Sequence, residues 1–169
     1  YLELRGACDQ VWLGGESMGG LLCLMLAAEF QEAAGLLLFA PALFVDNLKS
    51  AYIFQFFKKY IAKRGNDKGF EWRGYNVYPL KGVVQLRTLQ RKTRRILPRV
   101  TQPALIFLSE ADQTVEIKTG EVLMDGISSK RKELIVLKKS PHVMLLGQDQ
   151  DLIINKSIEF VEVTEFNQE

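Results

Sequence analysis

The apolar residues of this chain fall into continuous runs more often than into alternating ones. Four such runs are predicted to be strands: "QVWLGG" (10–15), "GLLLFAPAL" (35–43), "PALIFLS" (103–109) and "KELIVLKK" (132–139). A sheet with one face in water alternates apolar and polar residues, whereas strands covered on both faces read as unbroken apolar runs. We therefore expect a mostly parallel sheet that is flanked by helices.

Helical patterns separate these runs. "YLELRG" is typical of a short helix that ends at Gly6, and residues 18–31 predict a helix that is apolar nearly all round and therefore buried. Residues 114–128 and about 149–165 predict two more helices. The closing helix carries three apolar residues on one side: Ile154, Ile158 and Val161. Strands and helices that alternate with short connections indicate an α/β fold with right-handed crossovers.

One long section interrupts this alternation. Residues 44–100 contain 14 of the 22 Lys and Arg but three of the 20 Asp and Glu, so the section has a net charge of +11 and the remainder −9. Within it, residues 51–65 predict a helix with an aromatic and a basic face, 66–82 predict turns, and 83–100 predict an amphipathic helix. The section is therefore interpreted as an insertion between two units of the sheet.

One serine stands between glycines where the first strand gives way to the buried helix. Gly15-Glu16-Ser17-Met18-Gly19 fits the Gly-x-Ser-x-Gly pattern, in which a sharp turn exposes the serine Oγ. Glycines weaken both strand and helix, so their presence indicates that the local geometry matters. The Met18 N–H, at the start of the helix, would point at a developing oxyanion. Alternatively, Ser17 is only a helix N-cap.

Two further residues follow predicted strands directly. Asp112 comes after the third run and His142, the single histidine of the chain, after the fourth. Sites in open α/β sheets form at the carboxyl ends of the strands. Asp112 could instead form an Asx turn or cap the next helix, with Glu110 or Glu116 as a substitute, and a lone histidine is often only structural. The order serine, acid, histidine favours a catalytic triad of Ser17, Asp112 and His142.

These pieces resemble the α/β-hydrolases, and more closely their carboxylesterase and monoacylglycerol lipase branch. The resemblance rests on "GGESMGG", "LPRVTQPALIFLSEADQTV", "ISSKRKELIVLKKSPHVMLLGQDQD" and "SIEFV". It implies the C-terminal portion of an α/β-hydrolase fold: the nucleophile-elbow part over 1–43, a helical cap or lid over 44–100, and the part with the acid and the histidine over 101–169.

The resemblance also implies a reaction and a substrate class. Carboxylic esters would be cleaved through an acyl-enzyme on Ser17, with His142 as the base, Asp112 as its orienter and the Met18 N–H in the oxyanion hole. The substrates would be short- to medium-chain acyl esters or monoacylglycerols, although thioesterases and C–C hydrolases use the same triad. Aromatic residues of the insertion would line the acyl pocket or else form the core of the cap: Phe54, Phe57, Trp72 and Tyr75.

The chain departs from the family in one respect. Similar enzymes place several strands before the elbow, and one of them precedes the loop that donates the second oxyanion N–H. Here the elbow strand comes first, which leaves it with an open apolar edge of the kind that pairs with other chains. We expect either an N-terminal part that is missing or self-association at this edge. The alternative function is a non-catalytic α/β-hydrolase-like module that acts by binding.

The remaining composition narrows the function further. Cys8 and Cys23 provide no disulfide framework, which favours a reducing, cytoplasmic location. No metal-ligand cluster, phosphate loop or dinucleotide fingerprint is present in the sequence, so no metal or cofactor is expected. The basic runs predict either solvated helix faces or contact with an anionic membrane. No recognition motif supports nucleic-acid binding.

Overall fold

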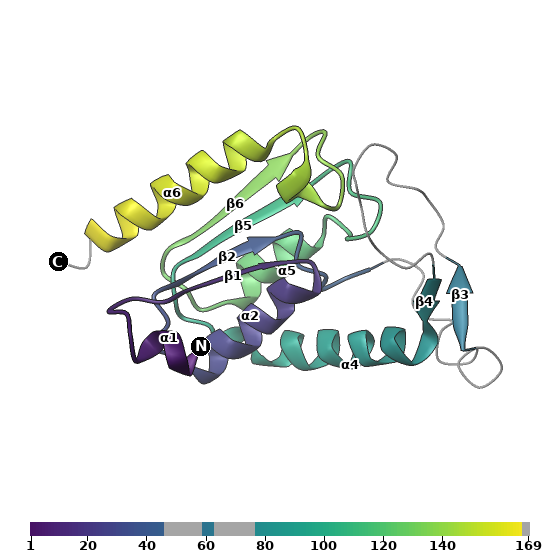
Figure 1. Ribbon diagram of the computed structural model, residues 1–169, viewed down its shortest axis with the longest axis horizontal. Coiled ribbons are helices and arrows are strands. Elements are labelled where there is room, and N and C mark those ends of the chain that lie inside the picture. The colour runs from purple at the N-terminus through teal and green to yellow at the C-terminus, as the bar shows by residue number, and fades with distance from the viewer. Residues whose placement is uncertain (46–58, 63–76, 167–169) are drawn as a thin grey trace.

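A four-stranded parallel sheet forms the centre of the protein. The computed structural model describes residues 1–45, 59–62 and 77–166 (Figure 1). All three strand pairings in the sheet are parallel, as the unbroken apolar runs predict. The strand order is β1 (Trp12–Glu16), β2 (Gly35–Phe39), β5 (Ala104–Ser109) and β6 (Lys132–Leu137).

Helices cover both faces of this sheet (Figure 1). Three helices lie on one face: α2 (Met18–Glu29), α4 (Leu80–Ile96) and α5 (Thr119–Gly126). The other face is covered by α6 (Gln150–Phe166). Successive residues of β5 point into two separate cores: Ile106 and Leu108 pack with α2, whereas Leu105 and Phe107 pack under α6. This period of two explains why a strand buried on both faces is apolar at every position.

The sheet has an open edge at β1, which pairs with β2 alone among the described strands. A short helix α1 (Leu2–Arg5), which ends at Gly6 as predicted, precedes this strand. On the side of α6, the Trp12 ring of β1 meets the Phe160 ring edge to face, with the centroids 6.1 Å apart. The edge strand is thus packed through its side chains, while its outer backbone groups face no other described strand.

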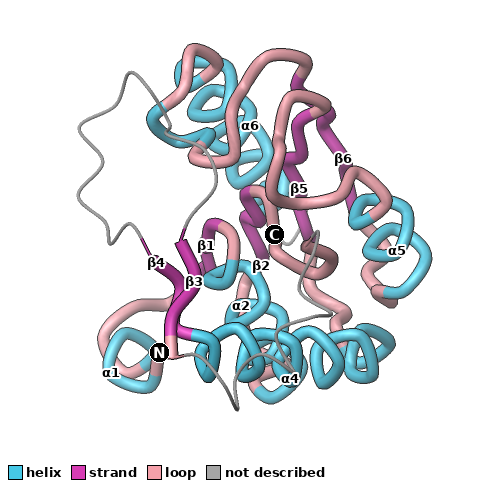
Figure 2. The backbone as a smooth tube through the Cα atoms, turned by 90° about the vertical axis from the view of Figure 1, so that its right-hand side faces the viewer, coloured by secondary structure: helices cyan, strands magenta, loops and turns pink. Residues whose placement is uncertain are grey.

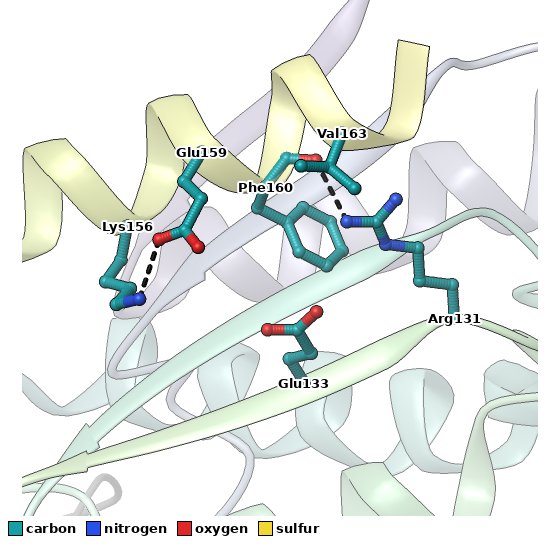
Figure 3. A pocket seen from close by; sticks show the side chains of 6 residues that line it. All are labelled: Arg131, Glu133, Lys156, Glu159, Phe160 and Val163. Atoms are coloured by element: carbon teal, nitrogen blue, oxygen red, sulfur yellow. Dashed lines mark hydrogen bonds and ion pairs between the residues drawn. The ribbon is translucent and has the colours of Figure 1, made fainter. Parts of the chain in front are cut away.

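Phe160 also holds α6 against the far edge of the sheet (Figure 3). The Arg131 guanidinium lies 4.6 Å from the centroid of this ring. A small pocket beside Phe160 and Arg131 lies near the start of β6. This is the end of the sheet opposite the carboxyl ends of the strands. Ile154 and Ile158, which share one side of α6, are 45% and 51% exposed. Apolar residues extend around much of α6, so periodicity alone does not identify its buried stripe.

The insertion differs from its prediction where the structure describes it. The helix predicted over 51–65 is wrong at β3 (Tyr60–Ala62), a strand that pairs antiparallel with β4 (Val77–Pro79) beside the start of α4 (Figure 2). The other residues of 51–65 lie outside the described ranges. The amphipathic helix predicted over 83–100 is confirmed as α4, which continues into the 3-10 turn η1 (Leu97–Arg99). The three-part division of the chain stays a prediction.

The C-terminal end of α2 shows how the last backbone carbonyls of this helix find hydrogen-bond donors. No N–H group within the helix donates to its last carbonyls, so they need donors from elsewhere. Gln102 Nε2 donates to Ala27 O at 2.9 Å, and Arg99 Nη2 donates to Ala28 O at 2.9 Å. Both donors come from the segment between α4 and β5. No helix of the described residues is long and apolar enough to cross a membrane.

Candidate active site

Ser17 lies at the junction of β1 and α2 in a strained backbone conformation. Its φ of 56° and ψ of −117° fall in a region that non-glycine residues rarely adopt. Backbone hydrogen bonds to residues 39–42 hold it there: the Ser17 N–H donates to Phe39 O at 2.8 Å, and Ser17 O accepts the Ala42 N–H at 3.0 Å. Ser17 occupies the N-cap position but makes no side-chain cap hydrogen bond. The capping alternative therefore does not account for its hydroxyl.

Residues 39–43, which hydrogen-bond to Ser17, are in turn hydrogen-bonded to α4. Ala40, which follows β2 directly and has a φ of 41°, donates its N–H to Phe107 O at 2.9 Å. Gln90 Nε2, from the buried side of α4, donates to Ala42 O at 2.7 Å. Arg94 Nη1 donates to Leu43 O at 3.1 Å. The helix that closes the basic insertion thus fixes the backbone behind the elbow.

Close backbone approach explains one glycine of the pattern but not the other. A Cβ on Gly15 would lie 2.5 Å from the carbonyl carbon of Gly19 and 2.8 Å from the Gly20 nitrogen. A Cβ on Gly20 would lie 2.9 Å from the Pro41 Cβ. A Cβ on Gly19 would meet nothing within 4 Å. Packing therefore requires Gly15 and Gly20, whereas Gly19 is open.

A chain of two hydrogen bonds joins the three predicted site residues. His142 Nε2 lies 2.9 Å from Ser17 Oγ, and His142 Nδ1 lies 2.9 Å from Asp112 Oδ2. The Asp112 side chain is 1% exposed and that of His142 is 18% exposed. Residues that are up to 125 positions apart in sequence thus meet at the carboxyl ends of β1, β5 and β6. The imidazole can exchange a proton with the hydroxyl on one side while the carboxylate orients it from the other.

Asp112 is also the Asx turn that its sequence context allowed. Its Oδ1 accepts the Thr114 N–H at 2.7 Å and the Val115 N–H at 3.0 Å, while Oδ2 is left for His142. The carboxylate thus forms the Asx turn through one oxygen and contacts His142 through the other. The turn also explains why the helix predicted from residue 114 begins only at Thr119. Glu110 is exposed, so it does not replace Asp112.

The pKa of Asp112 is lowered from its ordinary value of 3.8. Burial by itself would raise the pKa, because it penalises the charged form. The hydrogen bond and the charge of His142, together with the N–H groups of Val115 and Thr114, outweigh that burial. The carboxylate is therefore ionised at neutral pH, although its side chain is almost fully enclosed.

The other predicted site residues are only partly described. Met18 is the first residue of α2, so its N–H has no acceptor within the helix and points out of the helix start. The aromatic residues expected in the acyl pocket lie outside the described residues: Phe54, Phe57, Trp72 and Tyr75. Sequence reasoning missed Glu16, whose Oε1 accepts the Leu145 N–H at 3.3 Å. Glu16 thereby ties the elbow to the segment after His142.

The sheet is parallel, with a strained serine after one strand and a hydrogen-bonded acid and histidine after two others. These features define the class of α/β proteins with a serine-centred site. No protein-family model matches the chain. Within the described residues, no cluster of His, Cys, Asp and Glu side chains is placed to hold a metal ion.

Comparison with known proteins narrows this class. A thermostable monoacylglycerol lipase from Bacillus sp. (strain H-257) is 31% identical over 164 residues, which are 95% of this chain and 66% of that protein. A structure of the metagenome-derived lipolytic enzymes LipS and LipT has 32% identity and a TM-score of 0.88, over 95% of this chain and 68% of that one. A Paleococcus ferrophilus monoacylglycerol lipase shares the fold at 13% identity and a TM-score of 0.75, over 95% and 72%. The chain belongs to the α/β-hydrolases, in their carboxylesterase and monoacylglycerol lipase branch, and spans about two thirds of the length of its relatives at 31% and 32% identity.

The two glycines of the pattern should respond differently to alanine. Gly15→Ala is expected to lower the free energy of unfolding by about 3 kcal/mol or more, because backbone atoms cannot yield to the new Cβ. Gly19→Ala should be neutral or stabilise by up to about 1 kcal/mol, since alanine favours helix and the space is open. Urea unfolding of both variants measures the difference. Equal losses in the two variants would contradict the packing argument.

The lowered pKa of Asp112 predicts a pH-dependent stability difference. Asp112→Asn keeps the Oδ1 contacts but removes the charge, and should destabilise by about 1–3 kcal/mol at neutral pH. A depressed folded-state pKa contributes stability above the unfolded pKa and loses it as pH falls through the folded value. The advantage of the wild type should therefore shrink from pH 5.5 down to 3 in urea unfolding. An advantage that stays constant over that range would contradict the assignment.

Proposed function

We propose that this chain carries the catalytic residues of a serine hydrolase that cleaves carboxylic esters. The observation that supports this most is the hydrogen-bonded series of Ser17 Oγ, His142 and Asp112, with 2.9 Å at both steps. The strained backbone at Ser17 adds to it, because strain in an otherwise regular sheet concentrates at functional sites. Membership of a family that includes lipolytic enzymes is the third support.

The proposed reaction follows from these contacts. His142 Nε2 takes the proton of the Ser17 hydroxyl as Oγ bonds to the carbonyl carbon of the ester. The bond to the alcohol oxygen then breaks, and the same proton passes from Nε2 to the leaving alcohol. Water repeats the two steps and releases the acid, which restores the Ser17 hydroxyl. Asp112 stays ionised throughout and stabilises the imidazolium.

The negative charge on the carbonyl oxygen needs a donor during both steps. We assign this role to the Met18 N–H, which lies next to Ser17 at the positive end of α2. An N–H that no helical carbonyl accepts is already oriented, so no reorganisation is needed when the charge develops.

The proposed substrates are short- to medium-chain acyl esters or monoacylglycerols. The support is that two similar proteins, one from Bacillus sp. (strain H-257) and one from Paleococcus ferrophilus, are monoacylglycerol lipases. The apolar acyl chain would lie against the insertion, where the aromatic residues gather in the sequence. A thioester or a C–C bond substrate uses the same residues, so the leaving group is what the experiment must vary.

Hydrolysis of a graded set of p-nitrophenyl esters and monoacylglycerols tests the proposal. Ser17→Ala should lower kcat by more than about 10³-fold, because the nucleophile is gone. Ser128→Ala is the matched control and should leave the rate unchanged, because Ser128 is an exposed serine just beyond α5. A wild-type chain that is folded but hydrolyses none of these esters favours the binding-module alternative.

The pH dependence of the same assay reports on His142. Only a neutral imidazole accepts the serine proton, so a protonated His142 cannot act as the base. The rate should therefore rise from acidic toward neutral pH and then level off. A rate that is flat from pH 5 to 9 would exclude His142 as the base.

A further inference from the structure

Two buried serines outside the candidate triad connect the loops that carry its acid and its histidine. Ser109 is the last residue of β5 and is 2% exposed; Ser140 comes two residues before His142 and is 0% exposed. A buried hydroxyl is costly unless its hydrogen bonds are made. The contacts of these two hydroxyls therefore indicate what each is for.

The Ser109 hydroxyl bridges the two loops directly. Its Oγ donates to Ser140 O at 2.6 Å and accepts the Ala111 N–H at 3.2 Å. Ala111 immediately precedes Asp112, and Ser140 lies two positions before His142. One side chain thus sets the distance between the acid loop and the histidine loop, close to where the carboxylate and the imidazole must meet.

The Ser140 hydroxyl closes the histidine loop on its other side. Its Oγ donates to Asp149 Oδ2 at 2.6 Å. Asp149 immediately precedes α6, and its carbonyl accepts the Ile153 N–H of that helix at 3.0 Å. The segment from Ser140 to Asp149 is therefore attached to β5 at its beginning and to the start of α6 at its end.

Such attachment matters because the imidazole needs two partners at once. His142 must keep Nδ1 at Asp112 and Nε2 at Ser17, each at 2.9 Å, while its side chain stays 18% exposed. A displacement of about 1 Å can lower a rate roughly 10²-fold. Three backbone or side-chain contacts limit the loop: the two serine hydroxyls and the Leu145 N–H on Glu16.

We propose that Ser109 and Ser140 are positioning residues that orient His142 toward Asp112 and Ser17. Neither touches the reacting atoms; each acts by holding the backbone on which His142 is carried. The inference rests on the proposed function where hydrolysis is the readout, and on the geometry alone where the state of the imidazole is the readout.

The chain contains one histidine, which allows its imidazole to be observed directly. With ¹⁵N-labelled histidine, NMR of the wild type should show the tautomer that carries its proton on Nδ1, the nitrogen hydrogen-bonded to Asp112. Ser109→Ala and Ser140→Ala should each give a mixture of the two neutral tautomers. The measurement needs no substrate, so it is independent of the proposed activity.

Ser129→Ala is the matched control. Ser129 is 5% exposed, and its Oγ donates to a backbone carbonyl, Arg131 O, at 2.7 Å. Its residue type, burial and hydrogen bond match those of Ser109, but it lies before β6, at the opposite end of the sheet from His142. Ser129→Ala should keep the wild-type tautomer. Ser109→Ala that also keeps the wild-type tautomer would overturn the proposal.

Kinetics provide the second readout. In an active wild type, Ser109→Ala should lower kcat by about 10- to 100-fold with little change in KM, since positioning affects the chemical step more than substrate binding. Ser129→Ala should change neither parameter. Equal kcat values in Ser109→Ala and Ser129→Ala would contradict the positioning role. An inactive wild type that has the Nδ1 tautomer, lost in Ser109→Ala, would refute the proposed function and support the positioning role.

A pair of variants of equal shape covers the case in which Ser109→Ala does not fold. Ser109→Thr and Ser109→Val add the same volume, but only threonine can donate to Ser140 O and accept from the Ala111 N–H. The threonine variant should keep the Nδ1 tautomer and the valine variant should lose it. The same tautomer in both would contradict the proposal.

Discussion

The site depends on one backbone constraint, the strained conformation of Ser17 between β1 and α2. A residue with a φ of 56° persists only where its surroundings fix it, and here a carbonyl of β2 and the N–H of Ala42 do so. Gly15 and Gly20 permit the close approach of strand, helix and Pro41 that the turn needs. Because β2 pairs with β5 and β5 with β6, the same sheet that fixes Ser17 also delivers Asp112 and His142 to it.

Much of this arrangement could be predicted from the sequence. Unbroken apolar runs identified the four parallel strands, and the two central strands, β2 and β5, have residues in a core on both faces. The glycine pattern identified Ser17, and its position after a strand indicated the edge at which Asp112 and His142 would be found. The interpretation of Asp112 as an Asx turn was confirmed, and its second carboxylate oxygen contacts His142.

Other features left no local signal. The short strand β3 lies in a stretch whose aromatic and basic spacing favours a helix, and only its pairing with β4 reveals it. The sequence pattern does not reveal the buried side of α6, because apolar residues also occupy its exposed sides. Ser109, Ser140 and Glu16 act through contacts between loops that are distant in sequence. A serine or glutamate in a loop has too many ordinary roles for spacing to single it out.

The central claim is that Ser17 is a nucleophile activated by His142, and labelling with a fluorophosphonate tests it most directly. Intact mass spectrometry of the folded chain should show one adduct, peptide mapping should place it on Ser17, and Ser17→Ala should remain unlabelled. His142→Ala should be labelled far more slowly, because the hydroxyl then lacks the base that lies 2.9 Å away. A folded wild type that gains no adduct, or gains it at another residue, would contradict the account.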